Sequence, residues 1–346
     1  MTLRYALVAM AILLASCDPA VPPTGIAPPA DTTPQTGDTN ATPAGAPQFA
    51  VVRSPRSGTA DVTGGGGSTP AADSWWMVVL DSSGKVIDSV LGLPAQSPVD
   101  WSPDATRIAY GDSDGLVIRD MTTGQNTRIR ISPARNAYRP AWSPDGTKIA
   151  FEAFTGNDST WFDIHVVNAD GTGLRNLTKS FGGDWNPSWS PDGTKIAFVS
   201  SRKQPVACCV YPYPYMDVFI MNADGTNQTR VTDDALFDDG PAWSPDGSRI
   251  LFTRETAGDL RLHTIRPDGS ELSLIATPTE VDQHAKWSPD GTRIAYSSRP
   301  PGASPGPEAA WDYEIFTIKP DGSGFTRVTN NAVSDIYVSW APVKKG

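Results

Sequence analysis

Four aspartates recur at one position of a repeated sequence, and carboxylates arranged in this way can bind a cation. Asp184, Asp238, Asp282 and Asp335 each stand five residues before a tryptophan, and His284 follows two residues after the third of them. If the repeats surround an axis, these carboxylates converge at one mouth of a central channel. Oxygen ligands suit hard cations, so the group could hold Ca²⁺ or a basic peptide. The alternative is local, with each aspartate capping the loop that enters its own strand.

The aspartates are positioned by an internal repeat. Trp-Ser-Pro-Asp occurs five times, and a degenerate sixth copy, Trp340-Ala341-Pro342, lies near the end. The copies begin at Trp101, Trp142, Trp189, Trp243 and Trp287. Periods of about 40 to 50 residues with short alternating apolar segments indicate four strands per repeat, which is typical of propeller blades.

Each residue of the motif has a mechanical role. Pro144 presets the backbone for a turn, Asp145 can accept hydrogen bonds from the turn, and Gly146 takes a positive φ. The tryptophan should fill the space between neighbouring blades. A second turn follows each copy, as in Asn168-Ala169-Asp170-Gly171. We interpret these Asp and Gly residues as turn formers rather than catalytic groups.

The two ends of the repeat region complete one blade together. Tyr337 to Trp340 supplies a first strand, while Phe49 to Val52, Met77 to Leu80 and Val86 to Leu91 supply strands two, three and four. Pairing the C-terminal strand with the N-terminal three closes the ring and removes exposed sheet edges. The sequence therefore predicts an all-β protein, a closed six-bladed β-propeller over residues 48–346.

The segment from Trp142 to Phe151 resembles the repeat of TolB-type propellers, and the resemblance covers nearly everything after residue 47. It implies protein or peptide binding around the channel. TolB carries a further α/β domain before its propeller, which we do not expect here, so its functions are not transferred. We expect a scaffold rather than an enzyme, with no catalytic residue and no cofactor unless Ca²⁺ binds. The alternative is a propeller hydrolase or glycan lyase with a metal at the channel mouth, so a glycan ligand stays open.

The connections between strands two and three are long in four blades. They span Arg53 to Asp73, Phe154 to Phe162, Arg202 to Met216 and Arg299 to Asp312, on the face opposite the Trp-Ser-Pro-Asp turns. We call this side the irregular-loop face and the opposite side the turn face. Variable loops on a rigid ring commonly carry binding sites. The irregular-loop face, with its channel mouth, is therefore the predicted binding surface.

Aromatic residues outside the repeat motif gather in or beside these loops. They are Trp75, Trp76, Trp161, Trp185, Trp311, Tyr213 and Tyr215. Such rings are favoured anchors for proteins, peptides and sugars, and the alternative is packing of loop against loop. The adjacent thiols of Cys208 and Cys209 could close a vicinal disulfide, although adjacent Cα atoms lie closer than a disulfide prefers.

The N-terminal residues indicate export and anchoring. Residues 1–16 read as a signal peptide that ends in Leu14-Ala15-Ser16 before Cys17, which resembles a bacterial lipobox with Cys17 as the lipidated residue. Residues 17–47 are rich in Pro, Thr and Ala and should form a disordered tether. We therefore expect a cell-envelope protein, lipid-anchored at the periplasmic or extracytoplasmic face. A net charge of −10 without a basic cluster argues against nucleic acid.

Replacing Cys17 by Ser should abolish membrane anchoring and leave the propeller folded, because the tether shares no core with the ring. Labelling with a fatty-acid analogue and membrane fractionation measure this. A Cys17→Ser chain that still carries lipid would contradict the lipobox interpretation.

Overall fold

The computed structural model describes the repeat region in thirteen ranges. These are residues 49–54, 75–81, 84–93, 98–112, 114–131, 135–154, 162–180, 182–202, 216–234, 236–256, 258–301, 313–331 and 333–342. Within them the regular structure consists of β-strands β1 to β24. None of these residues forms a helix of the length and apolar character needed to cross a bilayer.

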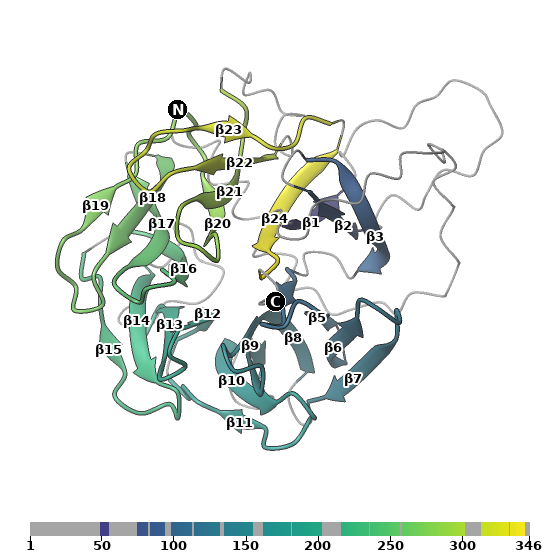
Figure 1. Cartoon of the computed structure of the whole chain (residues 1–346). Coiled ribbons are helices and arrows are strands. Elements are labelled where there is room, and N and C mark those ends of the chain that lie inside the picture. The colour runs from purple at the N-terminus through teal and green to yellow at the C-terminus, as the bar shows by residue number, and fades with distance from the viewer. Residues whose placement is uncertain are drawn as a thin grey trace, which may run out of the picture.

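Six four-stranded antiparallel sheets stand around a central axis as the blades of a propeller (Figure 1). From the channel outwards, blade 1 consists of β24 (Ser334–Trp340), β1 (Phe49–Ser54), β2 (Trp75–Leu80) and β3 (Val86–Leu93). Blade 2 consists of β4 (Asp100–Trp101), β5 (Arg107–Asp112), β6 (Gly115–Asp120) and β7 (Asn126–Arg130). Blade 3 consists of β8 (Arg135–Trp142), β9 (Lys148–Phe154), β10 (Phe162–Asn168) and β11 (Arg175–Asn176). Blade 4 consists of β12 (Asp184–Trp189), β13 (Lys195–Ser200), β14 (Asp217–Asn222) and β15 (Thr229–Arg230). Blade 5 consists of β16 (Asp238–Trp243), β17 (Ile250–Thr256), β18 (Asp259–Ile265) and β19 (Ser273–Leu274). Blade 6 consists of β20 (Gln283–Trp287), β21 (Ile294–Ser298), β22 (Glu314–Ile318) and β23 (Thr326–Arg327). The predicted six-bladed architecture is confirmed.

Blade 1 closes the ring by joining the two ends of the repeat region. β24 pairs antiparallel with β1, with Phe49 opposite Trp340 and Val51 opposite Val338. The Phe49 and Trp340 rings lie 4.3 Å apart between centroids. The predicted closure is therefore confirmed, including the strand that begins at Phe49.

The turns of the repeat are built by local hydrogen bonds. In blade 3 the Thr147 amide donates to Asp145 Oδ1 at 3.0 Å, and the Ser143 hydroxyl donates to the same oxygen at 2.6 Å. Gly146 has a φ of 69°. These hydrogen bonds hold the pKa of Asp145 below its usual value. The carboxylate is therefore committed to the turn, as the sequence predicts.

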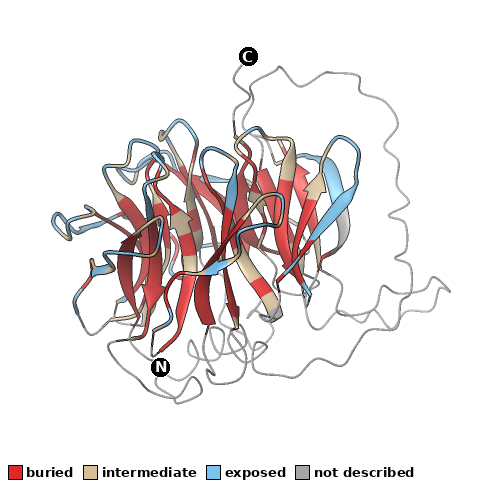
Figure 2. Cartoon of the chain, turned by 90° about the horizontal axis from the view of Figure 1, so that it is seen from below, coloured by how far each residue is buried: buried red, intermediate tan, exposed pale blue. Residues whose placement is uncertain are grey.

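The hydrophobic core lies within and between the blades, and Figure 2 shows the buried residues running along the strands. Leu116 and Ile118 of blade 2 share one buried cluster with Ile149 and Phe151 of blade 3. The repeat tryptophans contribute to the same inter-blade contacts. The Trp189 indole N–H donates to the Ala141 carbonyl of the preceding blade at 3.1 Å. Such packing makes each blade depend on its neighbours.

Deleting residues 335–346 should unfold or oligomerise the domain, because the deletion removes most of β24 and leaves the edge of β1 unpaired. Size-exclusion chromatography and thermal melting test this. As a control, an exposed-site variant such as Lys195→Met should keep both properties. A monomeric deletion variant with unchanged melting would contradict the closed ring.

Candidate functional site

The inner strands of four blades carry a β-bulge shortly before the repeat tryptophan. The pairing register shifts between Tyr138 and Ala141, Trp185 and Ser188, Asp239 and Ala242, and Gln283 and Lys286. In each bulge the residue three positions before the tryptophan has a positive φ, at Arg139 (46°), Asn186 (54°), Gly240 (61°) and His284 (52°). Glycine adopts this conformation without strain and asparagine tolerates it, so the backbone is held in an unfavourable conformation at Arg139 and His284. Such strain is concentrated at functional sites in proteins.

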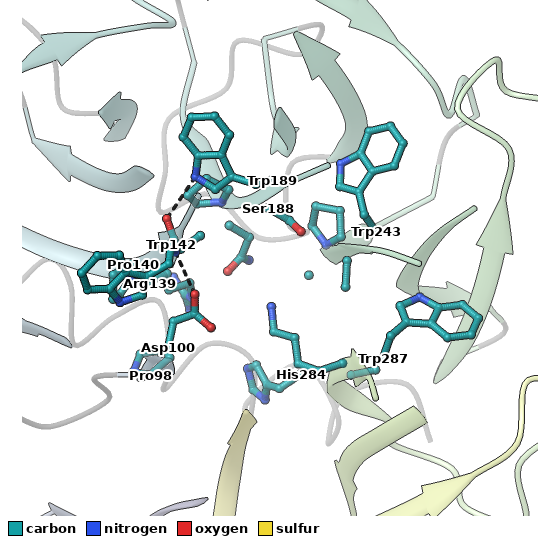
Figure 3. A pocket seen from close by; sticks show the side chains of 18 of the residues that line it. Pro98, Asp100, Arg139, Pro140, Trp142, Ser188, Trp189, Trp243, His284 and Trp287 are labelled. Carbon is teal, nitrogen blue, oxygen red and sulfur yellow. Dashed lines mark hydrogen bonds between the residues drawn. The ribbon is translucent and has the colours of Figure 1, made fainter. Parts of the chain in front are cut away.

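These bulges surround a cavity of about 320 Å³ in the central channel, which we call the channel cavity (Figure 3). Its wall includes Asp100, Arg139, Asn186, His284, Lys286 and Tyr337. Its rim includes Pro144, Pro191, Pro245 and Pro289, which belong to the Trp-Ser-Pro-Asp turns. The channel cavity therefore reaches the turn face rather than the irregular-loop face.

A chain of polar contacts runs along the wall through blades 3, 4 and 5. Arg139 Nη1 lies 2.7 Å from Glu152 Oε1, and the Asn186 amide donates to Glu152 Oε2 at 3.0 Å. The Asn186 side-chain amide donates to Asp239. Burial raises the pKa of both Glu152 and Asp239. These contacts compensate the cost of enclosing the charged groups.

Asp100 connects three blades at the same level. Its Oδ2 accepts the Trp142 amide at 2.8 Å, a bond drawn in Figure 3, and its Oδ1 lies 3.4 Å from the Ser339 hydroxyl. Burial raises the pKa of Asp100 to about 6, although the Trp142 amide and the Lys286 ammonium oppose this. Asp100 therefore changes charge close to neutral pH.

Two further titratable groups on the wall come from β20. Burial lowers the pKa of His284 to about 3, and the nearby cations Arg139 and Lys286 lower it further. The His284 ring packs edge-on against Tyr337, with 4.4 Å between centroids. Burial also lowers the pKa of Lys286. His284 is therefore neutral at physiological pH and cannot supply a positive charge to a ligand.

The four predicted aspartates lie near the other end of the same strands, and each is buried in a network of its own. Asp184 binds Arg202, Asp238 binds Arg254, Asp282 accepts hydrogen bonds from Thr277 and Thr279, and Asp335 binds Arg53 and Asn331. His284 lies apart from them, on the wall of the channel cavity. In the described part of the chain, no three acidic, His or Cys residues are grouped to hold a metal ion. The contacts correspond to the local alternative, in which each carboxylate fixes the entry to its own inner strand.

The predicted aromatic residues differ in their surroundings. Trp75 and Trp76 open β2 and are partly exposed, whereas Trp185 is buried and packs in one cluster with Phe162 and Phe252. Residues Cys17, Trp161, Cys208, Cys209, Tyr213, Tyr215 and Trp311 lie outside the described ranges. Of the predicted aromatic residues within the described ranges, Trp75 and Trp76 are therefore the two that remain partly exposed.

One pentapeptide fits a hydrolase motif without its structural context. Gly-Asp-Ser-Asp-Gly at residues 111–115 matches Gly-x-Ser-x-Gly, which carries a nucleophile between a strand and a helix. Here Asp112 pairs with Gly115 across the hairpin that joins β5 to β6. Arg128 forms ion pairs with Asp112 at 2.6 Å and Asp114 at 2.8 Å. The described residues of the segment therefore join two strands rather than a strand and a helix, and Ser113 itself lies outside the described ranges.

The cavity residues Asp100, Arg139 and Lys286 were not among the predicted site residues. A signal for them exists in the sequence, because all three stand one or three positions before a repeat tryptophan. Alanine, proline or glycine occupies the corresponding positions in several other blades. Charged residues at positions that other blades fill with alanine, serine, proline or glycine therefore mark the wall of the channel.

Asp100→Asn should change stability with a defined sign. Because folding raises the pKa of Asp100 from 3.8 to about 6, the folded state binds the extra proton between these values. As the pH falls from 7 to 4, the wild type should therefore gain stability relative to Asp100→Asn. The difference between their free energies of unfolding should change by roughly 2 kcal/mol in favour of the wild type. Urea unfolding of both proteins at several pH values measures this difference. A difference that does not change with pH would contradict the raised pKa of Asp100.

His284→Asn should show the opposite sign, because folding lowers the pKa of His284 from 6.5 to about 3. The unfolded chain then binds the proton first, so the wild type should lose stability relative to His284→Asn as the pH falls from 7 to 4. The loss should reach roughly 3 kcal/mol. Asparagine tolerates the positive φ at this position. If the stability of the wild type relative to each variant changed with pH in the same direction for both variants, the buried environments assigned to Asp100 and His284 would be wrong.

Comparison with known proteins agrees with this architecture. The Tol-Pal system protein TolB of Bordetella pertussis is 30% identical over 172 residues, which cover 48% of this chain and 36% of that protein. The chain thus spans about a third of the length of that relative. TolB from Acinetobacter baumannii superposes with a TM-score of 0.64 at 19% identity, over 86% of this chain and 67% of that one.

A manganese complex of oligogalacturonate lyase is also similar, with a TM-score of 0.52, 16% identity and coverage of 74% and 71% of the two chains. At this identity the likeness shows the fold alone. The family described as TolB beta propeller domain matches residues 71–214 and 204–342. The chain therefore belongs to the TolB beta propeller domain family.

Proposed function

We propose that this protein is a lipid-anchored scaffold of the cell envelope that binds a protein or peptide partner through its irregular-loop face and the adjoining channel mouth. The observation that carries the proposal is the contrast between the two faces. The connections of β1 to β2, β9 to β10, β13 to β14 and β21 to β22 are long and differ in length. On the turn face, blades 3, 4, 5 and 6 repeat one turn with the same Ser and Asp hydrogen bonds.

The base of the irregular-loop face is rigid, which suits a scaffold. Asp238 accepts two hydrogen bonds from Arg254, at 2.6 and 2.7 Å, and both side chains are buried. Asp335 and Arg53 tie β24 to β1 in the same way at 2.6 Å. Fixed strand ends hold loops in place and reduce the ordering cost of binding.

Membership of the family supports a protein partner, since the matched relatives include a Tol-Pal system protein. Anchoring through Cys17 would keep the ring at the envelope, and the tether of residues 17–47 would let it reach a partner. The binding residues that we propose are Trp75, Trp76, Trp161, Trp185, Tyr213, Tyr215 and Trp311. Among them Trp185 would act indirectly, because it is buried.

The test is capture from native envelopes with the intact lipoprotein, followed by affinity measurement with the purified partner. Trp161→Ala and Trp311→Ala should each weaken binding by about 2 kcal/mol or more, the usual effect of removing an aromatic anchor. Their melting temperatures should hardly change.

Phe252→Ala is the matched control, because Phe252 is fully buried and packs in the core. Its truncation should cost about 3 kcal/mol or more in stability, as for other buried aromatics. If Trp161→Ala and Trp311→Ala behave like this control, with lost stability and intact affinity at low temperature, the irregular-loop face is not the binding surface.

A further inference from the structure

The channel cavity contains two opposite charges, which influence each other's pKa but form no ion pair within 4.0 Å. Asp100 of blade 2 and Lys286 of blade 6 both line the wall. Among the described residues, no acid forms an ion pair with the Lys286 ammonium within 4.0 Å. Both side chains are partly exposed to the cavity. A carboxylate and an ammonium are therefore available to a ligand.

Asp100 already accepts the Trp142 amide through Oδ2 at 2.8 Å, which leaves part of its carboxylate for a ligand, and three other polar residues of the wall are engaged more fully. Arg139 is held by Glu152 at 2.7 Å, and the Asn186 side chain is held by Asp239. His284 Nδ1 lies 3.4 Å from the Ser297 hydroxyl and its ring packs against Tyr337. Binding to these groups would require breaking protein contacts, which leaves Asp100 and Lys286 as the accessible charges.

An enclosed ammonium without an ion-pair partner, such as that of Lys286, is costly, and a ligand that supplies the partner recovers that cost. A simple anion would be attracted by Lys286 but repelled by Asp100. A simple cation would be attracted by Asp100 but repelled by Lys286. A molecule that carries both an ammonium and a carboxylate can satisfy both residues at once. The charge pattern therefore selects a zwitterion.

The size and the stiffness of the cavity favour a compact molecule. Its volume of about 320 Å³ lies at the lower end of the range for small-molecule sites, roughly 300 to 1,000 Å³. Prolines form much of the wall and rim: Pro98, Pro140, Pro144, Pro187, Pro191, Pro241, Pro245 and Pro289. A proline-rich wall has few conformations to lose, so it is already shaped for a ligand.

We propose that the channel cavity is a second binding site, open to the turn face, and that it binds a small zwitterion such as a free α-amino acid or a dipeptide. Asp100 receives the ammonium of the ligand and Lys286 its carboxylate. The site lies on the opposite side from the irregular-loop face. It therefore goes beyond the proposed scaffold function and does not depend on it.

The test uses the purified full chain and isothermal titration with matched probes. L-alanine and L-alanyl-L-alanine carry both charges, whereas ethylamine and propionate each carry one. We expect the two zwitterions to bind at least about tenfold more tightly than either single-charge probe, the usual effect of one hydrogen bond to a charged group. Equal affinity for all four probes, or no binding of the zwitterions, would overturn the proposal.

Two variants assign the charges. Lys286→Met removes the ammonium and replaces the apolar part of the side chain with an unbranched one of similar length, and Asp100→Asn keeps an acceptor for the Trp142 amide. Each should reduce zwitterion affinity about tenfold or more. Lys195→Met, at an exposed site on blade 4, should bind as the wild type does. Unchanged affinity in both cavity variants would refute the assignment.

Thermal melting of each variant separates loss of binding from loss of folding. If a cavity variant does not fold, the comparison of the four probes on the wild type still decides the proposal. Trp161→Ala and Trp311→Ala should leave zwitterion binding intact, so the two proposed sites can fail independently.

Discussion

The pairing of β24 with β1 is the contact on which the rest of the structure depends. It joins residues 282 positions apart, such as Arg53 and Asp335, and turns an open row of blades into a ring. A closed ring fixes the distance between opposite inner strands, and this distance defines the channel. Without closure, the first and last blades would each expose an unpaired strand edge. Both the cavity and the two faces follow from this one pairing.

Closure also explains how the channel tolerates so many ionisable groups. The inner strands approach one another closely, so a side chain from one blade reaches the backbone of the next. The Asp100 carboxylate accepts the Trp142 amide, and the Glu152 carboxylate accepts the Asn186 amide. These bonds cross between blades and compensate the desolvation of the carboxylates. The same enclosure shifts the pKa values of Asp100 and His284 in opposite directions, because one acid and one base both favour their neutral forms there.

The fold could be predicted from sequence because its signals are local and repeated. Trp-Ser-Pro-Asp marks the end of the inner strand in five of the six blades, and a turn like that of Asp145 and Gly146 needs only neighbouring residues. The site could not be predicted to the same depth. The aspartates such as Asp238 are neutralised by arginines whose approach depends on tertiary structure. The bulges at Arg139, Asn186 and His284 redirect side chains that simple strand alternation would place elsewhere.

The two faces of the ring show why the departures from a repeat matter more for function than the repeat itself. Positions that recur, such as the tryptophans and the turn aspartates, are occupied in packing and turn formation, as Trp189 and Asp145 illustrate. Positions that vary between blades are not needed for this packing and turn formation. On the inner strands one such position is alanine in blades 3 and 5, yet Asp100 in blade 2 and Lys286 in blade 6. A ring built from near-identical blades thus acquires an asymmetric channel, and the proposed binding of one ligand in one orientation requires such asymmetry.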